Sequence, residues 1–164
     1  MGIKAKYTIT DVKKITNEFY NNVLKSIYLN LERAAIEVVN DAKNSETYAD
    51  QTGNLRSSIG FVIFYNGEAV SSGGFGGGAL FPNENGVKGS GTAGTSTGEK
   101  FALEVGKKYS SGFVVVIVAG MDYAAYVEAK GYDVITGSSF LLAPIFEKNL
   151  KIIKDETGLD FLRV

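Results

Sequence analysis

The chain has 164 residues, of which 45% are hydrophobic, and its 17 Lys and Arg residues nearly balance its 18 Asp and Glu residues. This length and composition predict one domain, residues 1–164, with a hydrophobic core. The near-neutral charge predicts no sequence-independent attraction to nucleic acid. The chain has no cysteine and no histidine, which excludes disulfides, thiolate metal sites and Ser-His or Cys-His nucleophiles. We therefore expect a protein that is not an enzyme and that uses no cofactor or metal.

The N-terminus, residues 1–6, lacks the apolar stretch of a signal peptide. No run of residues approaches the roughly 18 apolar positions that a membrane helix needs. We expect the chain to be made and folded in a cytoplasm, with no membrane partner.

A long amphipathic helix is predicted from Val12 onward. Apolar residues recur every three or four positions as far as Ala42, which is typical of one face of a helix. Thr10 and Asp11 offer a start cap, and the polar residues 43–45 offer an end. The apolar face is wide and includes small alanines, which favours packing on a sheet over a free coiled coil.

Two strands joined by a tight turn are predicted next. Residues 61–65 are β-branched or aromatic, and the Asn66-Gly67 dipeptide suits a hairpin that leads into a shorter strand at 68–71. Ahead of these strands, the sequence predicts a loop and then a short turn of helix within residues 48–59. Thr52 is the predicted cap of that turn.

Residues 71–98 are rich in glycine, serine and threonine. Such a composition buries too little apolar surface to offset its chain entropy, so we expect a long mobile loop or arm. Phe75, Leu80 and Phe81 lie within it, and they either pin the arm to its own domain or contact a neighbouring subunit. Residues 89–94 match the pattern G-x-G-x-x-G, but they do not link a buried strand to a helix, so no dinucleotide cofactor is predicted.

The remaining chain is predicted as helix, strand and helix. Residues 99–109 and 140–153 have helical spacing, and Pro144 lies near the first turn of the second helix. Residues 113–119 are continuously apolar, which indicates a strand buried on both faces or central in its sheet. This order favours an α+β domain with helices packed on one side of a small, mainly antiparallel sheet, and with the glycine-rich segment as a loop insertion.

Asp122, Glu128 and Asp133 form an acidic cluster near aromatic residues. Two carboxylates that flank a cleft can hydrolyse a glycosidic bond, so a carboxylate-based hydrolase stays open as an alternative function. The structural interpretation is favoured. It makes Asp122 a turn cap, Glu128 an ion-pair partner and Asp133 a solvated loop residue.

Two motifs resemble those of the tail-completion, or neck, proteins of long-tailed bacteriophages and related prophages. The first motif is Thr52-Gly53-Asn54-Leu55-Arg56-Ser57-Ser58-Ile59. The second is Tyr123-Ala124-Ala125-Tyr126-Val127-Glu128, which follows the strand at 113–119 and continues to Gly131. The family has T-G-x-L-R-x-S-I and Y-A-x-Y-V-E in this order, between a long N-terminal helix and a short C-terminal helix that contains proline.

The resemblance implies a structural virion protein that closes the head-proximal end of the tail, or joins it to the connector, as a ring that is commonly hexameric. The implied partners are further copies of the chain, the connector or head-closure protein, and the tail-terminator or tail-tube proteins. The implied location is the virion neck, reached from the host bacterial cytoplasm. A ring needs a heterologous interface, and an arm at residues 71–98 would order against the next subunit. Another virion ring, a tail terminator or a head closure, is the alternative.

Within the motifs we expect Thr52–Gly53 to shape the loop that enters the short helix. Leu55 and Ile59 are expected to pack beneath that helix. Arg56 and Glu128 are expected to meet as an ion pair that ties the first motif to the second, because each motif contains one of the two charges.

Overall fold

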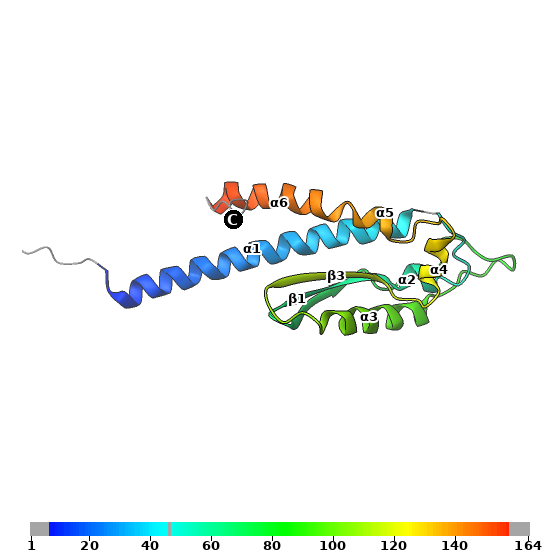
Figure 1. Ribbon diagram of the computed structural model, residues 1–164, viewed down its shortest axis with the longest axis horizontal. Helices are drawn as coiled ribbons and strands as arrows, with labels where there is room; N and C mark the ends of the chain where they lie inside the picture. Colours follow the sequence, from blue (N-terminus) through cyan, green and yellow to red (C-terminus); the bar gives the residue numbers. More distant parts are fainter. Residues whose placement is uncertain (1–6, 46, 158–164) are drawn as a thin grey trace, which may run out of the picture.

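The computed structural model describes residues 7–45 and 47–157 (Figure 1). It confirms the α+β class, with a long N-terminal helix, a small antiparallel sheet and a C-terminal helix. None of the helices in these two ranges combines the length and the hydropathy of a membrane span. The elements are α1 (Ile9–Asn44), α2 (Asn54–Ser57), β1 (Ile59–Tyr65), β2 (Glu68–Gly73), α3 (Thr92–Gly106), β3 (Phe113–Ala119), α4 (Ala124–Ala129), α5 (Thr136–Ser139) and α6 (Leu142–Thr157).

The sheet has the strand order β2-β1-β3, and both pairings are antiparallel. Asn66 and Gly67 have φ values of 52° and 85°, which suits the tight hairpin turn predicted between β1 and β2. β1 pairs with β3 from Ile59 opposite Ala119 to Tyr65 opposite Phe113. Of the two alternatives predicted for residues 113–119, the central position is wrong, because β1 is the central strand and β3 lies at an edge.

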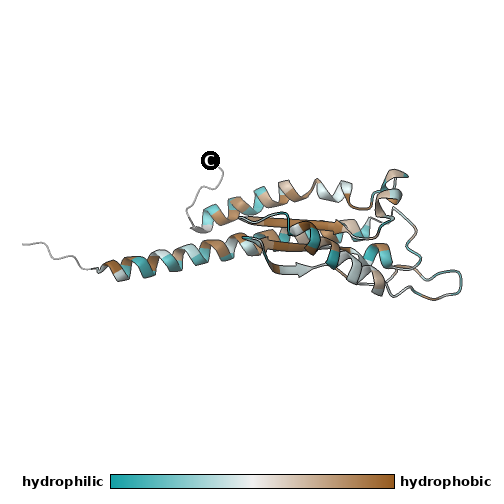
Figure 2. Ribbon diagram, turned by 60° about the horizontal axis from the view of Figure 1, so that its bottom comes forward, coloured by the Kyte–Doolittle hydropathy of each residue, from teal (hydrophilic) through white to brown (hydrophobic). Residues whose placement is uncertain are grey.

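Helices cover both faces of the sheet, which corrects the expectation that they pack on one side. In Figure 1, α1 lies on one face, α3 lies on the other, and α6 lies on the outer side of α1. Alternate residues of β1 therefore enter two cores, and the hydrophobic sheet lies between helices in Figure 2. The core on the α1 side contains Leu31, Ala35, Val39, Ala42, Leu55, Ile59, Phe61, Ile63, Ala124 and Val134. The core on the α3 side contains Val62, Phe64, Ala102, Val116 and Val118.

β3 is apolar throughout because both cores use it. Val115 and Ile117 pack against the core on the α1 side, while Val116 and Val118 belong to the core on the α3 side. The continuous apolar run therefore indicates that both faces of β3 are covered by helices, and it does not indicate a central position in the sheet.

The N-cap of α1 is Thr8, two residues ahead of the predicted cap at Thr10. The hydroxyl of Thr8 accepts the N–H of Asp11 at 3.2 Å, and the Asp11 carboxylate accepts the N–H of Thr8 at 2.9 Å. This reciprocal pair is a capping box. Thr10 is therefore inside the first turn, and the predicted cap at Thr10 is wrong. The helix ends among the polar residues 43–45, as predicted.

Part of the glycine-rich segment is strand or helix, so the loop predicted at residues 71–98 is shorter in the structure and spans residues 74–91. Residues 71–73 complete β2, and residues 92–98 form the first half of α3. Between them, the chain leaves only residues 81–88 as an exposed loop tip, which projects beyond α4 in Figure 1.

Close backbone packing explains why glycine is used in this segment. A Cβ at Gly98 would lie 2.3 Å from the carbonyl oxygen of Ser58, and a Cβ at Gly94 would lie 1.9 Å from that of Asn54. Glycine at these positions lets α3 approach the backbone of α2 and its C-cap directly. The same composition that predicts disorder here permits tight packing instead.

Candidate assembly site

The two motifs lie side by side at one end of the sheet. Gly120, just ahead of the second motif, donates its N–H to the carbonyl oxygen of Ser58 at 3.2 Å. Leu55 and Ile59 are buried in the core on the α1 side, and Ala124 of the second motif belongs to the same core. The motifs thus meet through the backbone and through shared apolar packing.

Thr52 and Gly53 form the entry to α2. Gly53 is the N-cap with φ of 74°, and a Cβ there would lie 2.4 Å from the backbone nitrogen of Ala79. The hydroxyl of Thr52 accepts the N–H of Asn54 at 3.3 Å, and its carbonyl oxygen accepts the N–H of Gly91 at 3.2 Å. Thr52 therefore shapes the loop, but the predicted helix cap at Thr52 is wrong, because the cap is Gly53 and makes no side-chain bond.

Arg56 and Glu128 do not form the predicted ion pair. The Nε of Arg56 donates to the carbonyl oxygen of Lys43 at 3.1 Å, and its Nη1 donates to that of Gly78 at 3.4 Å. In turn, the Nζ of Lys43 donates to the carbonyl oxygens of Gly74 and Gly76. The two cations together attach the C-terminal end of α1 to α2 and to the glycine-rich segment.

Glu128 instead organises the turn after α4. Its carboxylate accepts the N–H groups of Val134 at 3.1 Å, Ile135 at 3.3 Å and Thr136 at 3.1 Å. Partial burial acts to raise the pKa of Glu128, but the hydrogen bonds from Thr136, Val134 and Ile135 outweigh it and lower the pKa. An ionised carboxylate whose two oxygens are both occupied is a poor general acid.

Asp133 and Glu128 line the same shallow depression, of about 320 Å³. Oδ1 of Asp133 accepts the N–H of Gly137 at 2.8 Å, so this carboxylate also serves the turn rather than standing free. Gly131, with φ of 88°, follows α4. The Nζ of Lys130 lies 5.2 Å from the ring centroid of the exposed Tyr126, within range of a cation–π contact.

A cavity of about 400 Å³ lies between the motifs. Its lining includes Tyr123 of the second motif, together with Tyr48 and Asp50, which no sequence motif identified. Oδ2 of Asp50 is buried without a hydrogen-bond partner, and burial raises the pKa of Asp50. Burial, with Asp50 nearby, raises the pKa of Tyr48 to about 12. Burial also raises the pKa of Tyr123.

The three apolar residues of the glycine-rich segment have different surroundings. Phe75 packs against the core on the α3 side, and its ring lies over Gly60, where a Cβ would be 2.4 Å away. Leu80 is half-buried, and Phe81 is 64% exposed at the loop tip. Phe75 thus pins the segment to its own domain, and Phe81 is the member of the three that is open to a neighbour.

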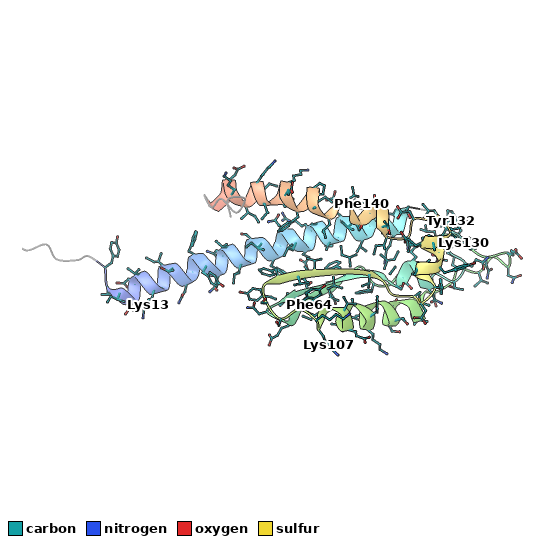
Figure 3. All side chains as sticks on the ribbon, viewed as in Figure 1. Lys13, Phe64, Lys107, Lys130, Tyr132 and Phe140 are labelled. Carbon is teal, nitrogen blue, oxygen red and sulfur yellow. The ribbon has the colours of Figure 1, made fainter. Side chains whose placement is uncertain are left out.

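The N-terminal half of α1 extends beyond the sheet (Figure 1). Residues 7–22 are all exposed, and the first buried residue is Val23. We call the six large apolar side chains at this end of the chain the free stripe; each is between 47% and 78% exposed. Tyr7 directly precedes the N-cap of α1, and the other five, Ile9, Val12, Ile15, Phe19 and Tyr20, are on the helix. Hydrophobic residues continue along this end of the helix in Figure 2. In Figure 3, Lys13 marks the same projecting end of α1.

Length explains why the free stripe is uncovered, although the sequence predicted that it packs on the sheet. A helix of 36 residues is about 54 Å long, whereas a strand of seven residues spans about 23 Å. The hydroxyl of Tyr20 lies 3.3 Å from that of Tyr65 at the end of β1. This contact marks the point where α1 leaves the sheet.

No family model, curated protein or solved structure matches the chain. Within residues 7–45 and 47–157, no three acidic side chains gather closely enough to hold a metal ion.

Proposed function

We propose that the chain is a structural protein of a tailed-phage virion, a neck or tail-completion subunit that forms a ring at the head–tail interface. The observation that carries this proposal is the free stripe. Its six side chains expose on the order of 800 Å², about what one partner contributes to a standard protein interface. A chain that worked alone would rarely leave so much contiguous apolar surface in water.

The residues of the two motifs support a scaffolding role. Leu55 and Ile59 pack in the core, Arg56 joins three segments of backbone, and Glu128 holds the turn after α4. The charged groups of Arg56 and Glu128 form hydrogen bonds with the protein's own backbone. The motifs thus build a stable end for the domain, and contact with partners is left to other surfaces.

Exposed apolar features lie at opposite ends of the elongated subunit. The free stripe projects at one end, and Phe81 lies on the loop tip, residues 81–88, at the other (Figure 1). A subunit of this form can contact neighbours at both ends, as a component between a connector and a tail must. A tail terminator or head-closure ring would have the same property, so these virion rings are the second candidate.

The hydrolase alternative has weaker support. Glu128 and Asp133 share a depression, but each carboxylate accepts backbone N–H groups of the following turn. The lowered pKa of Glu128 also opposes the protonated form that a glycosidase acid needs at neutral pH.

Quantitative mass spectrometry of purified phage particles tests the proposal. The expected result is a small fixed copy number relative to the major shell protein, six if the ring is hexameric. Electron microscopy of particles labelled through a tag on the chain should place it at the neck. Absence of the chain from intact particles would refute the virion role, and turnover of a glycan that Glu128→Gln abolishes would support the hydrolase.

A further inference from the structure

The spacing of the free stripe shows which kind of surface it fits. Val12, Ile15 and Phe19 follow the three-four spacing of a coiled-coil seam, but the next seam position is the polar Asn22. A coiled coil needs several consecutive heptads, and this seam has about one. The other members of the stripe widen the face, as in helices that pack on a globular core. The stripe is thus suited to a broad apolar surface rather than to another copy of itself.

Such a surface is open on the same molecule. A groove of about 470 Å³ lies where α1, β3 and α6 meet. Its lining is apolar except for Ser139, and the large side chains are Ile27, Leu31, Phe113, Val115, Leu142 and Phe146. The groove and the stripe are both apolar, so contact between them would bury apolar surface on both sides.

We infer that the free stripe of one copy packs into the groove between α1, β3 and α6 of the next copy; this inference rests on the ring proposed above. The area of the stripe is sufficient for one side of a stable interface. Residues 9–22 contain Asp11, Lys13, Lys14 and Glu18, so this segment has no net charge to oppose association between identical copies.

The stripe and the groove are different surfaces, so the contact is heterologous where each of them engages a different neighbour. The stripe lies on the projecting end of α1, and the groove lies beside the sheet. Each subunit therefore offers one stripe and one groove to different neighbours. Such contacts repeat from copy to copy, and they close into a ring when the rotation between copies allows it.

Cysteine cross-linking tests the contact without background, because the chain has no cysteine. A Phe19→Cys variant in the stripe is mixed with a Leu142→Cys variant in the groove and oxidised mildly over a series of concentrations. The expected product is a mixed disulfide dimer that exceeds the dimers of either variant alone. The matched control replaces Phe19→Cys by Asn17→Cys, which is exposed on the same projecting helix but outside the stripe, and should give little mixed product.

A charge substitution gives an independent readout. Ile15→Asp, in the Phe19→Cys variant, should lower the yield of mixed dimer at least about tenfold, since it places a carboxylate in the apolar contact. Asn17→Asp adds the same charge outside the stripe and should leave the yield unchanged. Both positions are exposed, so circular dichroism should show a folded protein in each case.

The outcomes separate the inference from the ring itself. Closed rings in electron micrographs without a mixed cross-link would overturn the inference and leave the ring standing. A mixed cross-link in open chains would support the contact and contradict the ring. Two further results would overturn the inference. A predominant Phe19→Cys homodimer would mean that the stripes of two copies contact each other. A mixed cross-link that appears only when the chain is shortened to end at Thr157 would mean that the chain's own last residues occupy the groove.

Discussion

The Nε of Arg56 donates a hydrogen bond to the carbonyl oxygen of Lys43 at 3.1 Å, which attaches α2 to the C-terminal end of α1. Arg56→Ala removes this bond and the bond to Gly78, so we expect the free energy of unfolding to fall by about 1–3 kcal/mol. Urea denaturation measures the change. Arg33→Ala, at an exposed position of α1, should change stability by less than about 0.5 kcal/mol. Equal effects of the two substitutions would contradict the proposed role of Arg56.

Lys43 should make the free energy of unfolding rise with pH in the alkaline range. Burial, followed by the nearby Arg56, lowers the pKa of Lys43 from 10.5 to about 8. A lysine that binds its proton more weakly in the folded state lowers stability below pH 8, and this penalty disappears as the pH rises from 8 to 10.5. Because Lys43 is only half-buried and solvent screens its charge, we expect a gain of about 1 kcal/mol across that window.

The measurement for Lys43 is the free energy of unfolding of the wild type minus that of Lys43→Met, obtained by urea denaturation at each pH. This difference cancels the titration of the tyrosines, which both proteins share. The variant should be less stable overall, because the carbonyl oxygens of Gly74 and Gly76 lose their donor. Parallel stability curves for the two proteins through this window would contradict the lowered pKa.

Gly98→Ala should destabilise the protein, although alanine normally stabilises a helix interior by about 1 kcal/mol relative to glycine. The added Cβ would lie 2.3 Å from the carbonyl oxygen of Ser58, so α3 must shift away. We expect a loss of about 2 kcal/mol or more, measured by thermal or urea unfolding. Ser96→Ala, at an exposed position of the same helix, should be nearly neutral. A gain in stability from Gly98→Ala would mean that α3 is not seated against Ser58.

The elements that depend on local chemistry could be predicted from the sequence. The apolar period of α1, the Asn66-Gly67 turn and the run of valines in β3 each determine their structure within a few residues. The first half of α3 could not be predicted, because its glycines are required by contact with a distant backbone at Ser58. Amino-acid composition does not indicate which distant backbone groups a glycine will contact.

The candidate site was harder to predict than the fold. The sequence identifies the motif residues, but the partners of Arg56 and Glu128 depend on which backbone groups the fold brings near them. The sequence also identifies the free stripe as part of one apolar face of a helix. Periodicity identifies an apolar face but not what covers it, and the seven-residue strands are too short to reach the stripe.

The two halves of α1 should differ in hydrogen exchange. Residues 12–22 are all exposed, and apart from the hydroxyl contact of Tyr20 with Tyr65 they bury no side chain that could stabilise the helix. A helix of this length without such support is marginal in water. We expect the amides of residues 12–22 to exchange with little protection in the isolated subunit. The amides of residues 34–42 should exchange slowly, because Ala34, Ala35, Val38, Val39 and Ala42 pack this part of the helix on the core. Assembly should slow exchange at residues 12–22. Uniform protection along α1 in a sample shown to be monomeric would contradict this expectation.

The tight packing of the glycine-rich segment matters for anyone who shortens the chain for crystallography. A boundary chosen from composition would remove residues 71–98 as a flexible insertion. That deletion would take the start of α3 with it and expose the side of the sheet that carries Val62 and Phe64; Figure 3 shows Phe64 where the sheet meets α3. Trimming the loop tip at residues 81–88 instead would leave both cores intact.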